Sequence, residues 1–220
     1  MELDYTKKRK QHTGNLHLLD GLVLDGKNEM PRMIPFVGCI PASVLPFNRA
    51  MTATRHDCAV HFFIDDYQFE RLWRQPEKYL PVLKRFQCVM SPDFSLFSDM
   101  PLPLQIFNTY RNRLIGRWLQ EHGVPVIPTV SWSDMRSYPF CFDGISVGST
   151  VAISTMGTRK NEYSRHLWER GATAMAERLQ PSKVLVYGQR VPFDFGGAEV
   201  VYYSNDITEK LHDYGRKRSL

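Results

Sequence analysis

Seven short runs of apolar, β-branched or aromatic residues recur along the chain and predict strands. They cover residues 34–40, 58–64, 88–90, 124–130, 150–154, 183–187 and 199–203. Most of these runs are apolar at nearly every position and do not alternate between apolar and polar residues. This pattern is typical of strands that are buried on both faces of a parallel sheet.

Segments with apolar residues at helical spacing separate these runs. The pattern predicts helices over residues 66–74, 76–86, 101–122 and 162–180. Pro76 opens the second of these helices, Gly123 ends the third, and Asn161 and Pro181 bound the fourth. Strands and helices therefore alternate with a period of about 30 residues, which is the length of a βα unit.

This alternation predicts an α/β fold with a mostly parallel sheet. We expect a small or incomplete (β/α) barrel that is TIM-like, although typical barrels have ~250 residues, and an open doubly wound sheet is the alternative. We expect three parts: an N-terminal arm with a basic cluster over residues 1–33, a single α/β domain over residues 34–206, and a basic C-terminal tail over residues 207–220.

Polar side chains end or follow six of the predicted strands, at the edge where parallel strands of α/β folds meet their ligands. They include Asp65, Asp93, Ser131, Asp134 and Tyr187. Capping of the next helix explains such residues as Asp66 and Ser204 without any function. We favour a functional role for Asp93, because Pro92 fixes the entry of the chain and Phe94 must be buried beside it.

Arg111 lies on the apolar stripe of the helix predicted over residues 101–122, where a charge must be paired. Asp93 and Asp99 lie just upstream and are the expected partners, and such a pair would order the loop between them. A purely structural role for Arg111 and a role in binding a phosphate or carboxylate are equally compatible with this position.

Two carboxylates at one edge, such as Asp93 with Asp65 or Asp134, suit two kinds of chemistry. One carboxyl group can protonate a leaving group while the other stabilises positive charge, as in glycosidic or N-glycosidic bond cleavage. The same pair can hold a divalent cation for phosphoryl chemistry. The sequence leaves this choice and the cofactor open.

The spacing of His56, Cys58 and His61 does not match a zinc site.

The formal net charge of +5 is concentrated at the two ends of the chain. The basic residues there are Lys7, Lys8, Arg9, Lys10, Arg216, Lys217 and Arg218. Residues 1–10 and 216–220 hold seven of the 28 basic and two of the 23 acidic residues, so the remainder has 21 of each. We expect the tails to bind nucleic-acid phosphates and the balanced body to bind a polar small molecule.

Two further patterns bear on the compartment. The sequence has no stretch of the ~18 apolar residues that a membrane span needs, and no apolar segment follows the N-terminal basic cluster as in a signal peptide. Its four cysteines are widely spaced, without a CxxC pair. We therefore expect a cytoplasmic protein with free thiols and no membrane association. The oligomeric state is left open.

Four segments carry a resemblance to a known family: VHFFIDDYQFERLW (60–73), CVMSPDFSLFSDMP (88–101), QIFNTYRNRLIGRWLQEHGVPVIPTVSWSD (105–134) and FCFDGISVGSTVAISTMGT (140–158). The chain resembles the family catalogued as domain of unknown function 4417, which is encoded largely by phages, prophages and conjugative elements of Gram-positive bacteria. The resemblance implies a mobile-element context and no established activity. It adds Asn108, Trp132 and Asp143 to the candidate residues, because they match the family's pattern.

Three hypotheses follow from these observations. The first is an enzyme-like barrel that acts on a nucleotide, sugar or nucleic acid, as a hydrolase or a glycosyl- or phosphoryl-transfer enzyme. Its candidate catalytic residues are Asp93, Asp65, Asp134 and Asp143, and its candidate substrate-binding residues are Arg111, Ser131, Trp132, Asn108 and Tyr187. The second is a non-catalytic accessory protein that binds nucleic acid or a replication or defence factor of the host. The third is a structural domain whose polar residues only cap helices.

Overall fold

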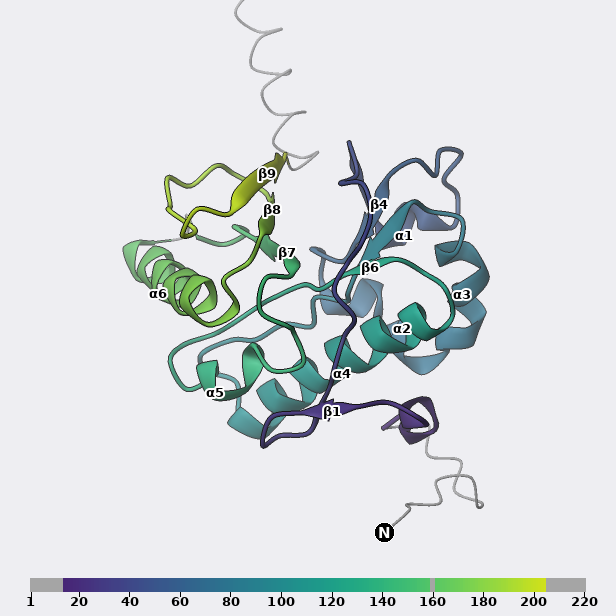
Figure 1. The fold of residues 1–220 in the computed structure, drawn as a ribbon, viewed down its shortest axis with the longest axis horizontal. Helices are drawn as coiled ribbons and strands as arrows, with labels where there is room; N and C mark the ends of the chain where they lie inside the picture. The colour runs from purple at the N-terminus through teal and green to yellow at the C-terminus, as the bar shows by residue number, and fades with distance from the viewer. Residues whose placement is uncertain (1–13, 159–160, 205–220) are drawn as a thin grey trace, which may run out of the picture.

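The computed structural model describes residues 14–158 and 161–204 of the 220-residue chain (Figure 1). The strands are β1 (Leu24–Asp25), β2 (Met30–Pro31), β3 (Val44–Pro46), β4 (Ala59–His61), β5 (Cys88–Met90), β6 (Val126–Ile127), β7 (Thr150–Ser154), β8 (Lys183–Tyr187) and β9 (Glu199–Tyr203). The α-helices are α1 (Phe47–Ala50), α2 (Glu70–Arg74), α3 (Pro76–Leu83), α4 (Leu102–Glu121), α5 (Tyr138–Cys141) and α6 (Glu162–Leu179), and short 3₁₀ helices span Leu16–Leu19 and Asp66–Gln68.

The parallel strands form two sheets, and in each sheet the strands follow the order of the chain. β3, β4, β5 and β6 make the first sheet, and β7, β8 and β9 make the second. A parallel bridge between Thr129 and Ala152 connects the segment after β6 to β7. The predicted α/β fold with mostly parallel strands is confirmed. Among the strands of residues 14–158 and 161–204, neither sheet contains the reversal of strand order that creates the crevice of a doubly wound fold.

The strands β4 to β8 are buried on both faces, as their nearly continuous apolar runs predicted, whereas β3 and β9 are partly exposed. On β5, Cys88 and Met90 pack in one cluster with Ala152 of β7 and Leu185 of β8. Val89, between them in sequence, belongs to a second cluster that lies under the helices of the first sheet. Successive side chains of a strand point to opposite faces, so each strand contributes to two cores.

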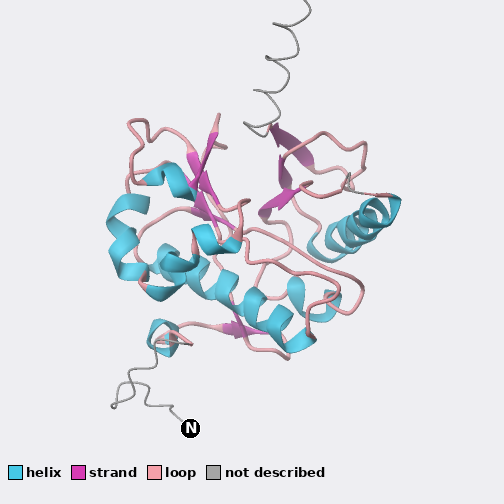
Figure 2. Cartoon of the chain, turned by 180° about the vertical axis from the view of Figure 1, so that it is seen from behind, coloured by secondary structure: helices cyan, strands magenta, loops and turns pink. Residues whose placement is uncertain are grey.

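The helices lie outside the strands, with α6 beside the second sheet and α2, α3 and α4 beside the first (Figures 1 and 2). The predicted ends of the two long helices are close to those observed. Gly123 has a φ of +78° just beyond α4, a conformation that favours glycine. At the start of α6, the Asn161 side chain accepts a hydrogen bond of 2.8 Å from the Ser164 N–H, as expected of an N-cap.

The strand predicted over residues 34–40 is not a strand in the structure. Pro35 and Gly38 interrupt this run, and the backbone N–H and C=O of Ile34 bind the side chain of Gln120 on α4 instead of a neighbouring strand. The first strand of the sheet is β3, further along the chain. β4 and β6 are also shorter than the runs that predicted them.

The segment before β3 is packed closely against the rest of the molecule. Met33 is buried in the cluster beneath α4, and Met30 is buried in the cluster of the second sheet. Leu18 is buried as well, whereas Leu24 is 43% exposed. Figure 1 shows this segment, with β1, running along α4. The basic residues of the two tails lie outside the described residues.

In the described part of the chain, no helix combines the length and the apolar composition that crossing a membrane requires.

Candidate functional site

Two adjoining cavities lie at the carboxyl ends of β5, β6 and β7. The inner cavity, of about 190 Å³, contains Asp93, Ser95, Val130, Ser131 and Ser154. The outer cavity, of about 530 Å³, contains Ser98, Asp99, Ser133, Gly157, Thr158, Ser164 and Leu167. Five residues line both cavities: Leu96, Phe97, Trp132, Met156 and Trp168. We call the two cavities together the rim cleft.

Asp93 is the carboxylate of the inner cavity. It is partly buried and lies between the buried residues Pro92 and Phe94, as the sequence indicated. The Ser131 Oγ donates a hydrogen bond of 2.6 Å to Asp93 Oδ1. The pKa of Asp93 is raised to about 7, mainly by burial. The bond from Ser131 acts in the opposite direction, and the nearby charge of Asp66 adds to the rise. Asp93 can therefore exchange a proton near neutral pH.

A polar network holds the loop that carries Asp93. The backbone N–H and the hydroxyl of Ser95 both donate to the carboxylate of Asp66, and the Ser95 carbonyl accepts a hydrogen bond of 2.7 Å from Asn108. Arg111 in turn donates to the Asn108 side chain at 2.6 Å and to Glu70 at 2.8 Å. These bonds connect the loop after β5 to α2 and α4.

The pairing of Arg111 differs from the prediction. We expected Asp93 or Asp99 as its partner, but the structure pairs it with Glu70 of α2. The Arg111 guanidinium also covers the Phe94 ring, with 3.8 Å between Cζ and the ring centroid. Its stacking and its ion pair turn it away from Asp93. Arg111 and Asn108 therefore support the loop and do not line the rim cleft.

Trp132 forms a wall shared by both cavities. Its ring centroid lies 6.2 Å from that of Trp168, and the Trp168 Nε1 donates a hydrogen bond of 2.9 Å to the Ser154 carbonyl. A Cβ atom on Gly171 of α6 would overlap the Trp132 indole. The absence of a side chain at Gly171 thus allows the indole to lie against α6.

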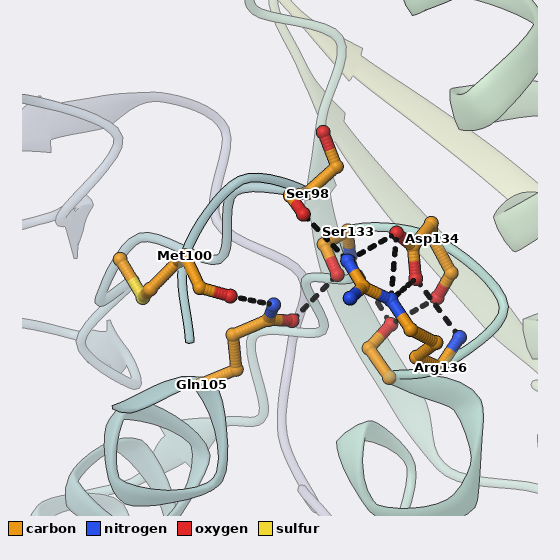
Figure 3. A network of polar contacts seen from close by, with 7 residues as sticks. Ser98, Met100, Gln105, Ser133, Asp134 and Arg136 are labelled. Atoms are coloured by element: carbon orange, nitrogen blue, oxygen red, sulfur yellow. Dashed lines mark hydrogen bonds and ion pairs between the residues drawn. The ribbon is translucent and has the colours of Figure 1, made fainter. Parts of the chain in front are cut away.

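The loop after Trp132 is fixed by a second network, at the outer cavity (Figure 3). Arg136 binds the carboxylate of Asp134 and donates to the Ser98 carbonyl at 2.5 Å. The Ser133 hydroxyl donates to Gln105 of α4 at 2.6 Å. Arg136 lowers the pKa of Asp134, which stays ionised. Asp134 is therefore a structural anchor for this wall and does not itself line the cleft.

The other candidates lie elsewhere. Asp65 is exposed and accepts a 3.5 Å hydrogen bond from Gln68. Asp143 precedes β7, pairs with Arg178 at 2.7 Å, and lines a separate cavity. Tyr187 is buried between the sheets, where its ring stacks on Phe63. The structure thus brings together Asp93, Ser131 and Trp132 from the predicted set.

Sequence reasoning gave no role to four of the five residues that line both cavities of the rim cleft, namely Leu96, Phe97, Met156 and Trp168. The exposed fractions of Phe97 and Met156 are 57% and 53%. The sequence did contain a sign of their role. Each is a large apolar residue in a polar loop that follows a strand, and exposing a large apolar side chain to water is unfavourable unless the side chain contacts a ligand or a partner.

Metal-ligating side chains do not gather in this cleft. Within residues 14–158 and 161–204, no three His, Cys, Asp or Glu side chains lie close enough together to hold a metal ion. The divalent cation stays a prediction from the sequence.

Residues 23–204 match the model of a family described as "Domain of unknown function (DUF4417)". The chain is similar to the "Gene 1 protein" of Mycobacterium phage L5, with 40% identity over 164 residues, which make up 73% of this chain and 71% of that protein. It is also similar to the "Gene 1 protein" of Mycobacterium phage D29, with 43% identity over 131 residues, 60% of this chain and 48% of that protein. The match therefore spans about half of the D29 protein. No solved structure matches the chain significantly.

Proposed function

The chain belongs to the DUF4417 family, whose description names no activity, and we propose a function from the rim cleft itself. The cleft binds a small polar molecule that contains a ring, and Asp93 exchanges a proton with it. The reaction class is hydrolysis or group transfer at a glycosidic or phosphoester bond. The observation that carries this proposal is the position of Asp93, hydrogen-bonded to Ser131 in a cavity lined by hydroxyl groups and two tryptophans, where burial raises its pKa to about 7.

Asp93 has the properties of a general acid and base. A carboxyl group with a pKa near the working pH is populated in both protonation states, so it can give and recover a proton within one turnover. Protonated Asp93 would donate to the leaving-group oxygen as its bond breaks. The carboxylate would then recover a proton from the water that completes the hydrolysis. Ser131 fixes the orientation of one carboxyl oxygen throughout.

The position of the cleft supports this proposal. We propose that the seven parallel strands form an incomplete barrel around the cluster that contains Cys88, Met90, Ala152 and Leu185. The strands of each sheet follow each other in chain order. The Tyr203 hydroxyl, at the end of β9, donates a hydrogen bond of 2.7 Å to the carbonyl of Pro41, which lies shortly before β3. In barrels, ligands bind at the carboxyl ends of the strands, which is where the cleft lies.

The test uses 4-nitrophenyl glycosides and bis(4-nitrophenyl) phosphate as chromogenic substrates. We expect release of 4-nitrophenol by the wild-type protein, with a rate that changes with pH around 7. Asp93→Asn keeps the shape of the side chain and removes the titrating group, so we expect it to slow the reaction by about 10²-fold or more. Asp65→Asn is the control, because Asp65 is exposed and does not line the cleft, so this variant should retain the rate. Turnover that Asp93→Asn leaves intact, or no turnover of any substrate, would contradict the proposal.

A further inference from the structure

We infer that the rim cleft binds an uncharged sugar chain, with one ring beside Asp93 in the inner cavity and the next ring in the outer cavity. This inference rests on the proposed function of the cleft and names its ligand. The sequence alone left nucleotides, sugars and nucleic acids as equal alternatives. The side chains that line the cleft discriminate between them.

The dimensions of the cleft indicate more than one ring. Ligand pockets commonly measure ~300–1,000 Å³. The inner cavity, at about 190 Å³, is smaller than this and fits a single ring, whereas the outer cavity, at about 530 Å³, falls within the range. The shared lining of Trp132, Phe97 and Met156 makes the two cavities continuous. A ligand of linked rings would occupy both.

The lining combines aromatic faces with hydroxyl groups. Sugar rings present apolar C–H faces and polar hydroxyl edges, so they require both kinds of contact. Trp132, Trp168 and Phe97 offer the apolar surfaces. The hydroxyl groups belong to Ser95, Ser131 and Ser154 in the inner cavity and to Ser98, Ser133, Ser164 and Thr158 in the outer cavity. The hydroxyls of Ser95, Ser131, Ser133 and Thr158 donate to groups of the protein, so their oxygens would act as acceptors for a ligand. Asp93 and Asp99 add carboxylate acceptors, one in each cavity.

The charge of the lining argues against a phosphate-containing ligand. Phosphate groups are usually bound by Arg or Lys side chains, and neither these residues nor His occurs among the described residues that line the cleft. The basic side chain that reaches the outer wall, Arg136, is engaged by Asp134 and the Ser98 carbonyl. The described lining is acidic and would repel a nucleotide or a nucleic-acid backbone.

The test compares neutral and anionic probes on the full chain. A glycan array of neutral mono- to hexasaccharides identifies the retained sugar, and titration calorimetry then measures its affinity alongside AMP and the oligonucleotide (dT)8. Phe97→Ala removes an exposed ring of the cleft with little effect on folding. We expect it to weaken binding of the retained oligosaccharide by roughly fivefold or more, and to weaken binding of its monosaccharide as well, because Phe97 lines both cavities. Tyr67→Ala removes an exposed aromatic ring outside the cleft and should change neither affinity.

The remaining outcomes separate this inference from the proposed function. One contrary outcome is that the protein retains no neutral glycan but binds AMP or (dT)8, and that Phe97→Ala weakens this binding. This result would overturn the inference of a sugar ligand, although the cleft would still be a binding site. Arg159 and Lys160, which follow Thr158 and lie outside the described residues, are changed to Ala in a further variant. Loss of AMP or (dT)8 binding in that variant would identify an anionic ligand and likewise overturn the inference. Hydrolysis of the chromogenic substrates that depends on Asp93 would still support the proposed function in both cases.

Discussion

Among single residues, Asp93 has the most unusual environment in the rim cleft. The sequence predicted its position, because a short apolar run ends three residues earlier and Pro92 and Phe94 flank it. It could not predict the partner of Arg111. Glu70 is 41 residues away on another helix, and nothing local distinguishes it from the carboxylates of the nearby loop. Contacts within one βα unit can be inferred from the sequence, whereas the choice among distant partners depends on how the helices pack.

The raised pKa of Asp93 has a direct consequence for stability. Between its ordinary value of 3.8 and about 7, the folded carboxyl group retains a proton that the unfolded one has released. Stability from this group is therefore lost as the pH rises through that range. Asp93→Asn removes this pH-dependent loss. The free energy of unfolding of the variant minus that of the wild type should therefore increase between pH 4 and pH 8, by an amount on the order of 2 kcal/mol.

Urea unfolding at pH 4, 6 and 8 measures this difference. His61, whose pKa burial lowers to about 3, acts in the opposite direction on acidification, but both proteins contain it and its effect cancels in the difference. Asp134→Asn is the control. Arg136 lowers the pKa of Asp134, so the control should lose stability at pH 8. A pH-independent difference between Asp93→Asn and wild type would refute the assignment of the titrating group.

At the scale of elements, the rim cleft depends on the contact between α6 and the loop after β6. Gly171 lies inside α6, where glycine is a weak helix former. Its value here is the space that it leaves for the Trp132 indole. The periodicity of α6 predicted the helix and its cap, but the close approach of a loop residue 39 positions earlier has no local sequence signal.

We therefore expect opposite effects of Gly171→Ala in two backgrounds. In the wild-type protein, the added methyl group displaces Trp132 and should lower both stability and ligand affinity. In the Trp132→Ala background the space is free, and the gain in helix propensity should stabilise the protein by up to about 1 kcal/mol. A double-mutant cycle by urea unfolding measures this coupling. Equal effects of Gly171→Ala in the two backgrounds would show that the indole does not lie against α6.

At the scale of the whole molecule, the buried side chain of Arg113 connects the two sheets. It donates to the Thr129 carbonyl at 3.0 Å, to the Asp143 carbonyl at 2.9 Å and to the Cys141 carbonyl at 2.7 Å. Burial lowers its pKa to about 10, so it stays charged at neutral pH. These carbonyls belong to the segments between β6 and β7, where a single backbone bridge connects the sheets.

Arg113→Lys should therefore destabilise the whole fold. One ammonium group cannot reach all the carbonyls that the guanidinium binds, and each buried carbonyl left without a donor costs about 1–3 kcal/mol. We expect a loss of about 3 kcal/mol in urea unfolding. Arg165→Lys is the control, because Arg165 forms an exposed ion pair with Glu169 on α6 and should lose less than about 0.5 kcal/mol. A comparable loss in both variants would contradict the role of Arg113.

The α/β class and the mostly parallel strands followed from hydrophobic periodicity, because each βα unit carries its own pattern. The apolar run over residues 34–40 predicted a strand that does not form. Apolar content alone does not show that the side chain of Gln120 binds the backbone of Ile34. Cys88 and Val89, which lie in the predicted run over residues 88–90, are buried as expected. The convergence of Asp93, Ser131 and Trp132 follows from parallel strands ending at one edge, whereas Asp143 lies before its strand and so points elsewhere.

The pair of tryptophans in the rim cleft has a spectroscopic consequence. With centroids 6.2 Å apart and planes inclined by 46°, the Trp132 and Trp168 indoles are close enough for their excited states to couple. Trp73 and Trp118 lie in the separate cluster beneath α4. A ligand that shifts Trp132 would change the exciton signal in circular dichroism and the emission of the pair, so the protein carries an intrinsic optical reporter of the occupancy of its own cleft.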